Sequence, residues 1–222
     1  MGDLGKSAKS GEKQDHPGTL IKICGITREE DAQNALDSGV DAIGLNFYAA
    51  SPRYLTIEQA IQISNLVKGN ALIVGLFVNA ESDFVRQVQR KVPLDILQFH
   101  GDETPEYCEQ FKCSYWKALR VKDSAQVARQ IQAHAKASAI LVDAWHEEQY
   151  GGTGETFDWD LIKDLTFSQK LILAGGINPQ NAAEAIKQVR PWGIDVSSGV
   201  EESPGIKSAK LMKQFIEEVR SV

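Results

Sequence analysis

The stretch Leu20-Ile-Lys-Ile-Cys24, followed at once by Gly25-Ile-Thr-Arg-Glu-Glu30, contains the unit that decides the fold. Its first part is a short, largely apolar run that contains two β-branched residues, Ile21 and Ile23, and its second part carries a helix start signal. Near-continuous apolar runs are typical of strands that are buried on both faces, as in a parallel sheet. The stretch therefore predicts one buried strand followed by one helix.

The same unit recurs along the chain, with helix signals between the apolar runs. Thr27 with Glu30, and Thr56 with Gln59, have the spacing of a capping box, and Asn178-Pro179 places a cap residue before a proline. Eight strand–helix units in roughly 200 residues predict an α/β protein with a closed (β/α)8, or TIM, barrel. An open dinucleotide-binding sheet is the alternative, but Cys24-Gly-Ile-Thr-Arg28 lacks its Gly-x-Gly-x-x-Gly turn. The seven further runs are 42–47, 71–78, 95–99, 115–119, 139–143, 170–174 and 193–197.

Composition sets the limits of this domain and its surroundings. The 222 residues, 42% of them hydrophobic, are enough for one catalytic barrel over residues 20–222, and the polar residues 1–19 predict a disordered leader. A net charge of −6 argues against nucleic acid or an anionic membrane as a partner. Three cysteines, an odd and sparse count, favour a reducing compartment, and we expect a cytoplasmic protein.

Polar residues stand where the predicted strands end, and barrel enzymes carry their active sites at that rim. Cys24 ends the first strand, His100 follows the fourth, and Asp143 ends the sixth. The helix after Cys24 could lower the pKa of its thiol, and partial desolvation could suit Asp143 to act as a general acid. A buried, inert thiol and a salt-bridged rim carboxylate are the alternatives, and these residues alone leave the choice open.

Two glycine-rich loops favour a phosphate site over ordinary turns. Barrels often bind phosphate after strands seven and eight, where glycines let backbone N–H groups approach an anion closely. On the loop after the second strand, Arg53 could pair bidentately with a carboxylate or a phosphate, or be an exposed surface residue. Gly151-Gly-Thr-Gly154, beside Asp143, is either a lid loop or a plain turn. The loop residues expected to bind phosphate are Gly175, Gly176, Ser197, Ser198 and Gly199.

Taken together, the motifs resemble those of the phosphoribosylanthranilate isomerase family. The resemblance covers residues 20 to about 216, and several motifs occur in the family's order. Ala49-Ala50, Asn46 and Asp143-Ala-Trp145 depart from the family's usual residues, although no matched catalytic group is lost. The matching motifs are Lys22-Ile-Cys-Gly-Ile-Thr27, Phe47-Tyr-Ala-Ala-Ser-Pro-Arg-Tyr54, Gly75-Leu-Phe-Val-Asn79, Leu97-Gln-Phe-His-Gly101, Tyr150-Gly-Gly-Thr-Gly154, Phe157-Asp-Trp159, Ala174-Gly-Gly-Ile-Asn-Pro179 and Asp195-Val-Ser-Ser-Gly-Val200.

The resemblance implies an Amadori rearrangement in tryptophan biosynthesis, run by general acid–base catalysis without a cofactor or a metal. It implies Cys24 as the general base, Asp143 as the general acid, and Arg53 as the ligand of the anthranilate carboxylate. The two glycine and serine loops would hold the phosphate, and we add His100 to the substrate-binding residues. The expected partner is a small phosphosugar, and the expected state is a monomer or a homodimer.

Two other functions fit parts of the pattern. A histidine-pathway isomerase performs a similar Amadori step. A chain that resembled that family would be expected to carry an Asp at the end of the first strand, where this chain has Cys24. A non-catalytic binder of phosphorylated ligands could have kept the fold, but it would need neither Cys24 nor Asp143.

Overall fold

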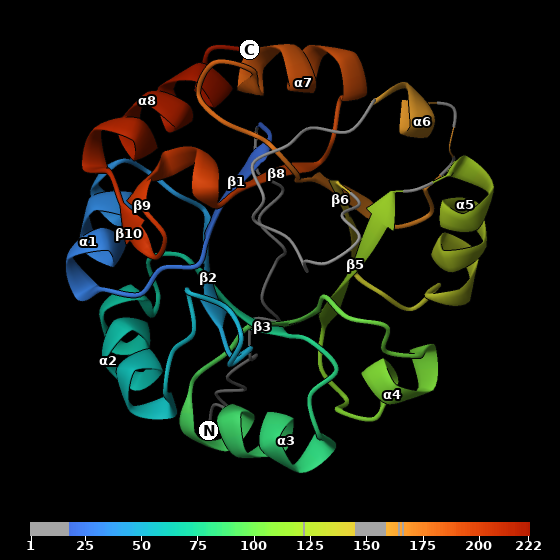
Figure 1. The fold of residues 1–222 in the computed structure, drawn as a ribbon, viewed down its shortest axis with the longest axis horizontal. Helices are drawn as coiled ribbons and strands as arrows, with labels where there is room; N and C mark the ends of the chain where they lie inside the picture. The colour runs from blue at the N-terminus through green and yellow to red at the C-terminus, as the bar shows by residue number, and fades with distance from the viewer. Residues whose placement is uncertain (1–17, 122, 145–158, 164, 166) are drawn as a thin grey trace, which may run out of the picture.

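Eight parallel strands close into a barrel, with each strand paired to the next along the chain and β8 paired to β1. The structure is a computed structural model that describes residues 18–121, 123–144, 159–163, 165 and 167–222. Figure 1 shows the ring of strands end-on, with the helices outside it. The strands are β1 (Leu20–Cys24), β2 (Ala42–Asn46), β3 (Leu72–Phe77), β4 (Ile96–Phe99), β5 (Tyr115–Val121), β6 (Ala139–Ala144), β7 (Lys170–Leu173) and β8 (Gly193–Val196).

A helix follows each strand, and the (β/α)8 barrel predicted from the eight apolar runs is confirmed. The chain after β8 first forms the short 3₁₀ helix η1 (Ser198–Val200) and a two-stranded hairpin, β9 (Glu201–Ser203) with β10 (Ile206–Lys207). The helices are α1 (Glu29–Asp37), α2 (Ile57–Val67), α3 (Ser82–Lys91), α4 (Pro105–Glu109), α5 (Ser124–Ala133), α6 (Asp160–Lys163), α7 (Ala182–Val189) and α8 (Ala209–Arg220).

Two apolar layers hold the barrel together because successive side chains of a strand point to opposite faces. The larger layer lies between the strands and the helices, and Ile21, Ile23 and Phe215 belong to it. The smaller layer fills the inside of the barrel towards the amino ends of the strands, where Leu20, Val74 and Trp116 pack together. The apolar interior leaves the opposite rim free for polar groups.

Local signals along the chain are only partly confirmed. Thr56 and Gln59 form the predicted capping box at the start of α2. The capping box predicted at Thr27 is wrong, because α1 begins after Arg28 and has no side-chain cap. The Thr27 hydroxyl instead donates a hydrogen bond to the carbonyl oxygen of Gly205, in the β9–β10 turn. A tertiary contact has thus taken the group that would have capped the helix.

Some predicted features lie outside the described residues. These are the leader up to residue 17 and the glycine loop Gly151-Gly-Thr-Gly154. Within the described part of the chain, no helix has the length and apolar character needed to cross a membrane.

The aromatic cluster around Phe99 gives a test of the outer layer. Phe99 is fully buried, and its ring lies 5.6 Å from that of Phe111 and 5.7 Å from that of Tyr107. Replacing Phe99 with alanine should lower the free energy of unfolding by about 3–5 kcal/mol, because the cavity cannot collapse fully. Urea unfolding followed by circular dichroism measures this. Phe84→Ala, at a half-buried ring of the same cluster, should cost clearly less, and an equal loss would contradict the assignment.

Candidate active site

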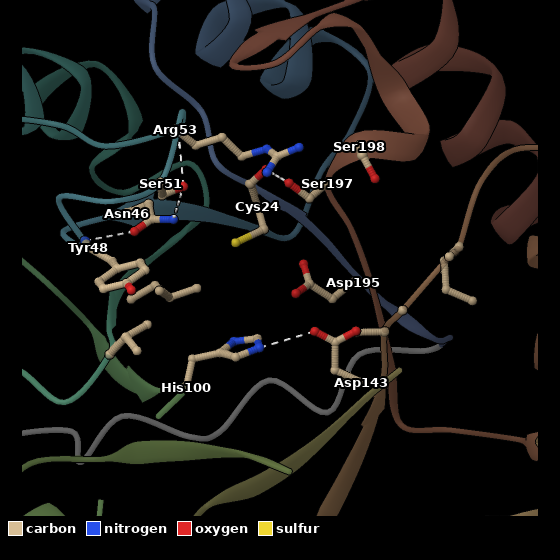
Figure 2. A pocket seen from close by; sticks show the side chains of 16 residues that line it. Cys24, Asn46, Tyr48, Ser51, Arg53, His100, Asp143, Asp195, Ser197 and Ser198 are labelled. Atoms are coloured by element: carbon tan, nitrogen blue, oxygen red, sulfur yellow. Dashed lines mark hydrogen bonds and ion pairs between the residues drawn. The ribbon is translucent and has the colours of Figure 1, made fainter. Parts of the chain in front are cut away.

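A polar pocket opens at the carboxyl ends of the strands, at the rim where the sequence placed the candidate residues. Figure 2 shows these side chains converging from strands and loops far apart in the sequence. Cys24 reaches the pocket from β1 and Asp143 from β6, although β7 and β8 separate the two strands around the ring. The pocket is lined by Cys24, Asn46, Tyr48, Ser51, Arg53, Leu76, Val78, His100, Asp143, Ala174, Gly175, Gly176, Ile177, Asp195, Ser197 and Ser198.

Asp143 is held by the imidazole of His100. The Nε2 atom of His100 lies 3.1 Å from Oδ2 of Asp143, and its Nδ1 atom lies 3.0 Å from Nε2 of Gln98. The Gln98 amide nitrogen can only donate, so Nδ1 accepts this hydrogen bond and Nε2 is placed to donate a hydrogen bond to the Asp143 carboxyl group. Asp143 and His100 are both nearly buried, so this contact orients the carboxyl group towards the pocket.

The thiol of Cys24 is buried among charged groups. Burial raises the pKa of Cys24 above its ordinary value, while the positive charge of Lys22 acts in the opposite direction. The expectation that the following helix would lower the pKa of this thiol is therefore wrong in its net direction. Desolvation of the thiolate outweighs the favourable charges, because little water reaches the end of β1.

A buried ion pair lies next to Cys24 inside the barrel. Nζ of Lys22 lies 2.9 Å from both carboxylate oxygens of Asp195, and Lys22 has no exposed surface. Sequence reasoning quoted both residues within motifs but assigned neither a role. The signal was available, because a lysine inside an otherwise apolar strand must find a buried partner.

Arg53 is also held by a carboxylate of the protein. Its Nε and Nη2 atoms each lie 2.8 Å from an oxygen of Glu201, in a bidentate pair. Nζ of Lys207 lies 2.8 Å from the same carboxylate. Burial lowers the pKa of Lys207, and it outweighs the opposite effect of the Glu201 charge. The structure thus excludes an exposed surface role for Arg53. Sequence reasoning missed Glu201 and Lys207, because both belong to the short polar hairpin that it did not predict.

The two predicted phosphate loops meet at one side of the pocket. Gly175 and Gly176 have positive φ angles of 79° and 65°, and within the described residues their N–H groups donate to no protein acceptor. Ser197 and Ser198 line the pocket beside them. Gly199 does not line it, because it packs against the loop after β7, where an added Cβ would lie 2.1 Å from the Ile177 carbonyl oxygen. Gly199 therefore sets the distance between the two loops.

No metal centre is found in the part of the chain that the structure describes, where no three His, Cys, Asp or Glu side chains form a group that could hold an ion. The polar groups of the pocket are instead donors and acceptors of protons and hydrogen bonds. A thiol and a carboxyl group that face one ligand can move protons, while the arginine and the glycine loops can bind two anionic ends of that ligand.

Comparison with known proteins agrees with this arrangement. Residues 21–218 match the family model for N-(5′-phosphoribosyl)anthranilate (PRA) isomerase. The N-(5′-phosphoribosyl)anthranilate isomerase of Nitrosococcus oceani is 48% identical over 92% of this chain and 98% of its own, and that of Pseudomonas fluorescens (strain Pf0-1) is 50% identical over 90% and 97%. The crystal structure of the phosphoribosylanthranilate isomerase from Thermotoga maritima is 37% identical, with a TM-score of 0.83, over 92% of this chain and 100% of its own.

These matches span nearly the whole of both partners, so they concern the complete barrel and not a shared fragment. The resemblance seen in the sequence motifs is confirmed. The chain belongs to the phosphoribosylanthranilate isomerase family.

Proposed function

We propose that this chain catalyses the Amadori rearrangement of N-(5′-phosphoribosyl)anthranilate to 1-(2-carboxyphenylamino)-1-deoxyribulose 5-phosphate, a step of tryptophan biosynthesis. The observation that carries the proposal is the joint presence of Cys24 and Asp143 in one pocket that also presents an arginine and two glycine loops. A thiol and a carboxyl group can serve as base and acid, and the other groups match the two anionic ends of this substrate.

The reaction divides into two proton transfers by the protein. Asp143, in its protonated form, donates a proton to the furanose ring oxygen, so the C1′–O bond breaks and the nitrogen lone pair forms the Schiff base. Cys24, as the thiolate, then removes the proton from C2′, and the electrons of that C–H bond form the enolamine. Tautomerisation of the enolamine to the ketone gives the product. General acid–base catalysis of this kind contributes about 10²–10⁴-fold for each group.

The two groups end the cycle in the opposite protonation states from those in which they began. Cys24 then carries the proton from C2′ as a thiol, and Asp143 is a carboxylate. Transfer of one proton from Cys24 to Asp143 through solvent restores the active pair. Because burial raises the pKa of Cys24, the thiol form is favoured at rest, and the active form must be stabilised by charges near the sulfur.

The remaining polar groups position the substrate. In this proposal Arg53 binds the anthranilate carboxylate with Nη1 and the second N–H of Nη2, because Glu201 occupies Nε and the other N–H of Nη2. Gly175, Gly176 and Ser198 bind the phosphate at the other side of the pocket, because backbone N–H groups and a hydroxyl suit an anion. A relative of known structure supports a ligand with two anionic ends: a phosphoribosylanthranilate isomerase that is 37% identical to this chain was solved in complex with reduced 1-(o-carboxyphenylamino)-1-deoxyribulose 5-phosphate, which carries a carboxylate and a phosphate.

The activity itself is tested by anthranilate fluorescence after the purified protein is added to freshly generated phosphoribosylanthranilate. A fast, saturable change is expected for the wild-type protein. Cys24→Ala and Asp143→Asn should each lower kcat by about 10²–10⁴-fold, because each removes one proton-transfer group. Circular dichroism should show both variants folded. Turnover that survives in both folded variants would exclude the assigned acid and base, and no change with the wild-type protein would exclude the function.

Arg53→Ala tests the carboxylate site. Loss of the guanidinium should raise KM by at least about tenfold with a smaller change in kcat, because the arginine binds substrate and transition state alike. Lys136→Ala removes an exposed cation whose partner is Glu109, far from the pocket lining, and should leave both constants unchanged. An unchanged KM for Arg53→Ala in steady-state kinetics would contradict the role of Arg53.

Gly199→Ala tests the spacing of the phosphate loops. The added methyl group would meet the Ile177 carbonyl oxygen, so the loops after β7 and β8 must move apart. We expect weaker inhibition by inorganic phosphate and a higher KM, by at least about tenfold each, from the loss of about 1.4 kcal/mol of binding. Gly18→Ala is the control, since neither Gly18 nor Gly199 has a positive φ and the nearest atom to the Cβ added at Gly18, Nη1 of Arg220, lies at an ordinary 3.8 Å. Equal phosphate inhibition in both variants and the wild-type protein would reject the site.

A further inference from the structure

The ion pair of Lys22 and Asp195 inside the barrel has no part in the proton transfers described above. Lys22 is fully buried and does not line the pocket, so it does not touch the substrate. Removing an ammonium and a carboxylate from water costs several kcal/mol for each ion, and an apolar pair of similar volume is often as stable. A gain in the stability of the fold therefore does not explain why the pair is present. Its position next to Cys24 suggests a role in catalysis instead.

The ammonium group of Lys22 and the sulfur of Cys24 both lie next to Gly44. Both residues belong to β1 and are two positions apart, so their side chains point to the same face, into the barrel. Gly44, on the neighbouring strand β2, contacts both. A Cβ built on Gly44 would lie 2.7 Å from Sγ of Cys24 and 3.2 Å from Nζ of Lys22. The absence of a side chain at residue 44 thus lets the thiol and the ammonium approach each other.

The charged groups around Cys24 come from several elements. After burial, the charge of Lys22 on the same strand has the largest influence on the pKa of Cys24. Lys22 favours the thiolate, as does Lys207 on β10. The carboxylate of Asp195 on β8 disfavours the thiolate, but less strongly than Lys22 favours it. Arg53, on the loop after β2, also interacts electrostatically with Cys24. Across the pocket stand His100 on the loop after β4 and Asp143 on β6.

Arg53 and Lys207 already share the carboxylate of Glu201, which offsets their charge. Lys22 is paired with Asp195, which is not bonded to any other cation among the described residues. Asp195 keeps Lys22 protonated inside the barrel, since an isolated buried lysine would give up its proton. The carboxylate also holds the ammonium group in place, through two hydrogen bonds of equal length.

We infer that Lys22 is a positioning residue that stabilises the Cys24 thiolate, and that Asp195 holds Lys22 in the charged state and the orientation this requires. The inference rests on the proposed function, because it concerns the state of the general base. Lys22 forms no bond with the substrate, and its effect is on how often Cys24 carries a negative charge. Lys22 thereby raises the fraction of Cys24 that is present as the thiolate, the form that removes the proton from C2′.

The test measures the thiolate directly, without turnover. Iodoacetamide alkylates thiolates, and peptide-resolved mass spectrometry reports Cys24 separately from the exposed Cys113. In Lys22→Met, the midpoint of Cys24 alkylation should move upward by at least about one pH unit, and the rate at pH 8 should fall about tenfold or more, because an adjacent opposite charge favours an ionised group. The same variant should lower kcat and leave KM nearly unchanged.

Lys117→Met is the matched control. Lys117 is as buried as Lys22 and is bonded to Glu103, but it comes from β5 and does not act on Cys24. Its alkylation profile at Cys24 should equal that of the wild-type protein. An unchanged midpoint in folded Lys22→Met, or the same shift in both variants, would overturn the inference. Neither result depends on activity, so the alkylation outcome stands apart from the outcome of the fluorescence assay.

Lys22→Met leaves Asp195 unpaired and could prevent folding. The double variant Lys22→Met with Asp195→Asn removes both charges and avoids a lone buried carboxylate. The pH midpoint of Cys24 alkylation in this double variant should still lie above the wild-type value, because the ammonium group of Lys22 acts on Cys24 more strongly than the carboxylate of Asp195 does. A folded double variant with the wild-type midpoint, or a lower one, would also overturn the inference.

Discussion

Closure of eight parallel strands brings all their carboxyl ends to a single rim, and every other feature of the site depends on this geometry. Cys24 and Asp143 lie on β1 and β6, which are not neighbours in the ring, yet both reach one pocket. An open sheet would leave such residues at distant positions along an edge. Because the inside of the barrel is packed with apolar side chains towards the other end, the polar groups are confined to the rim, where a ligand can meet all of them.

Paired charges keep this rim rigid. Among the described residues, four buried cations around the site and its supporting loops each meet a carboxylate: Lys22 meets Asp195, Arg53 meets Glu201, Lys207 shares Glu201, and Lys117 meets Glu103. Buried charges are tolerated when their partners are well placed, and such partners also prevent the long side chains from sampling other rotamers. Arg53 therefore presents a fixed charge to the pocket before a substrate arrives, and the lysines hold fixed charges behind the pocket lining. Electrostatic groups that need no reorganisation are the ones that contribute most to catalysis.

The sequence predicted the repeating part of this molecule far better than the irregular part. Eight apolar runs are enough to predict the barrel, because a parallel strand is recognised by its burial, and the rim residues follow from where each run ends. The hairpin of β9 and β10 was missed because its strands have three and two residues and are largely polar. Thr27 was misread because a capping pattern is local, whereas its hydroxyl bonds a residue far along the chain. The pairing of Lys22 with Asp195 was missed because β1 and β8 become neighbours only when the barrel closes.

The raised pKa of Cys24 and its proposed role as a base are two consequences of the same burial. A thiolate in a dry site is costly, so the proton prefers the sulfur at rest. The same dryness strengthens the attraction between a thiolate and a nearby ammonium, and it makes the thiolate that does form a stronger base. The barrel therefore needs only to bring the thiol and thiolate forms of Cys24 close in free energy. Lys22, a fixed cation beside the sulfur, can stabilise the thiolate in every catalytic cycle, because it acts on the charge of Cys24 and not on the substrate.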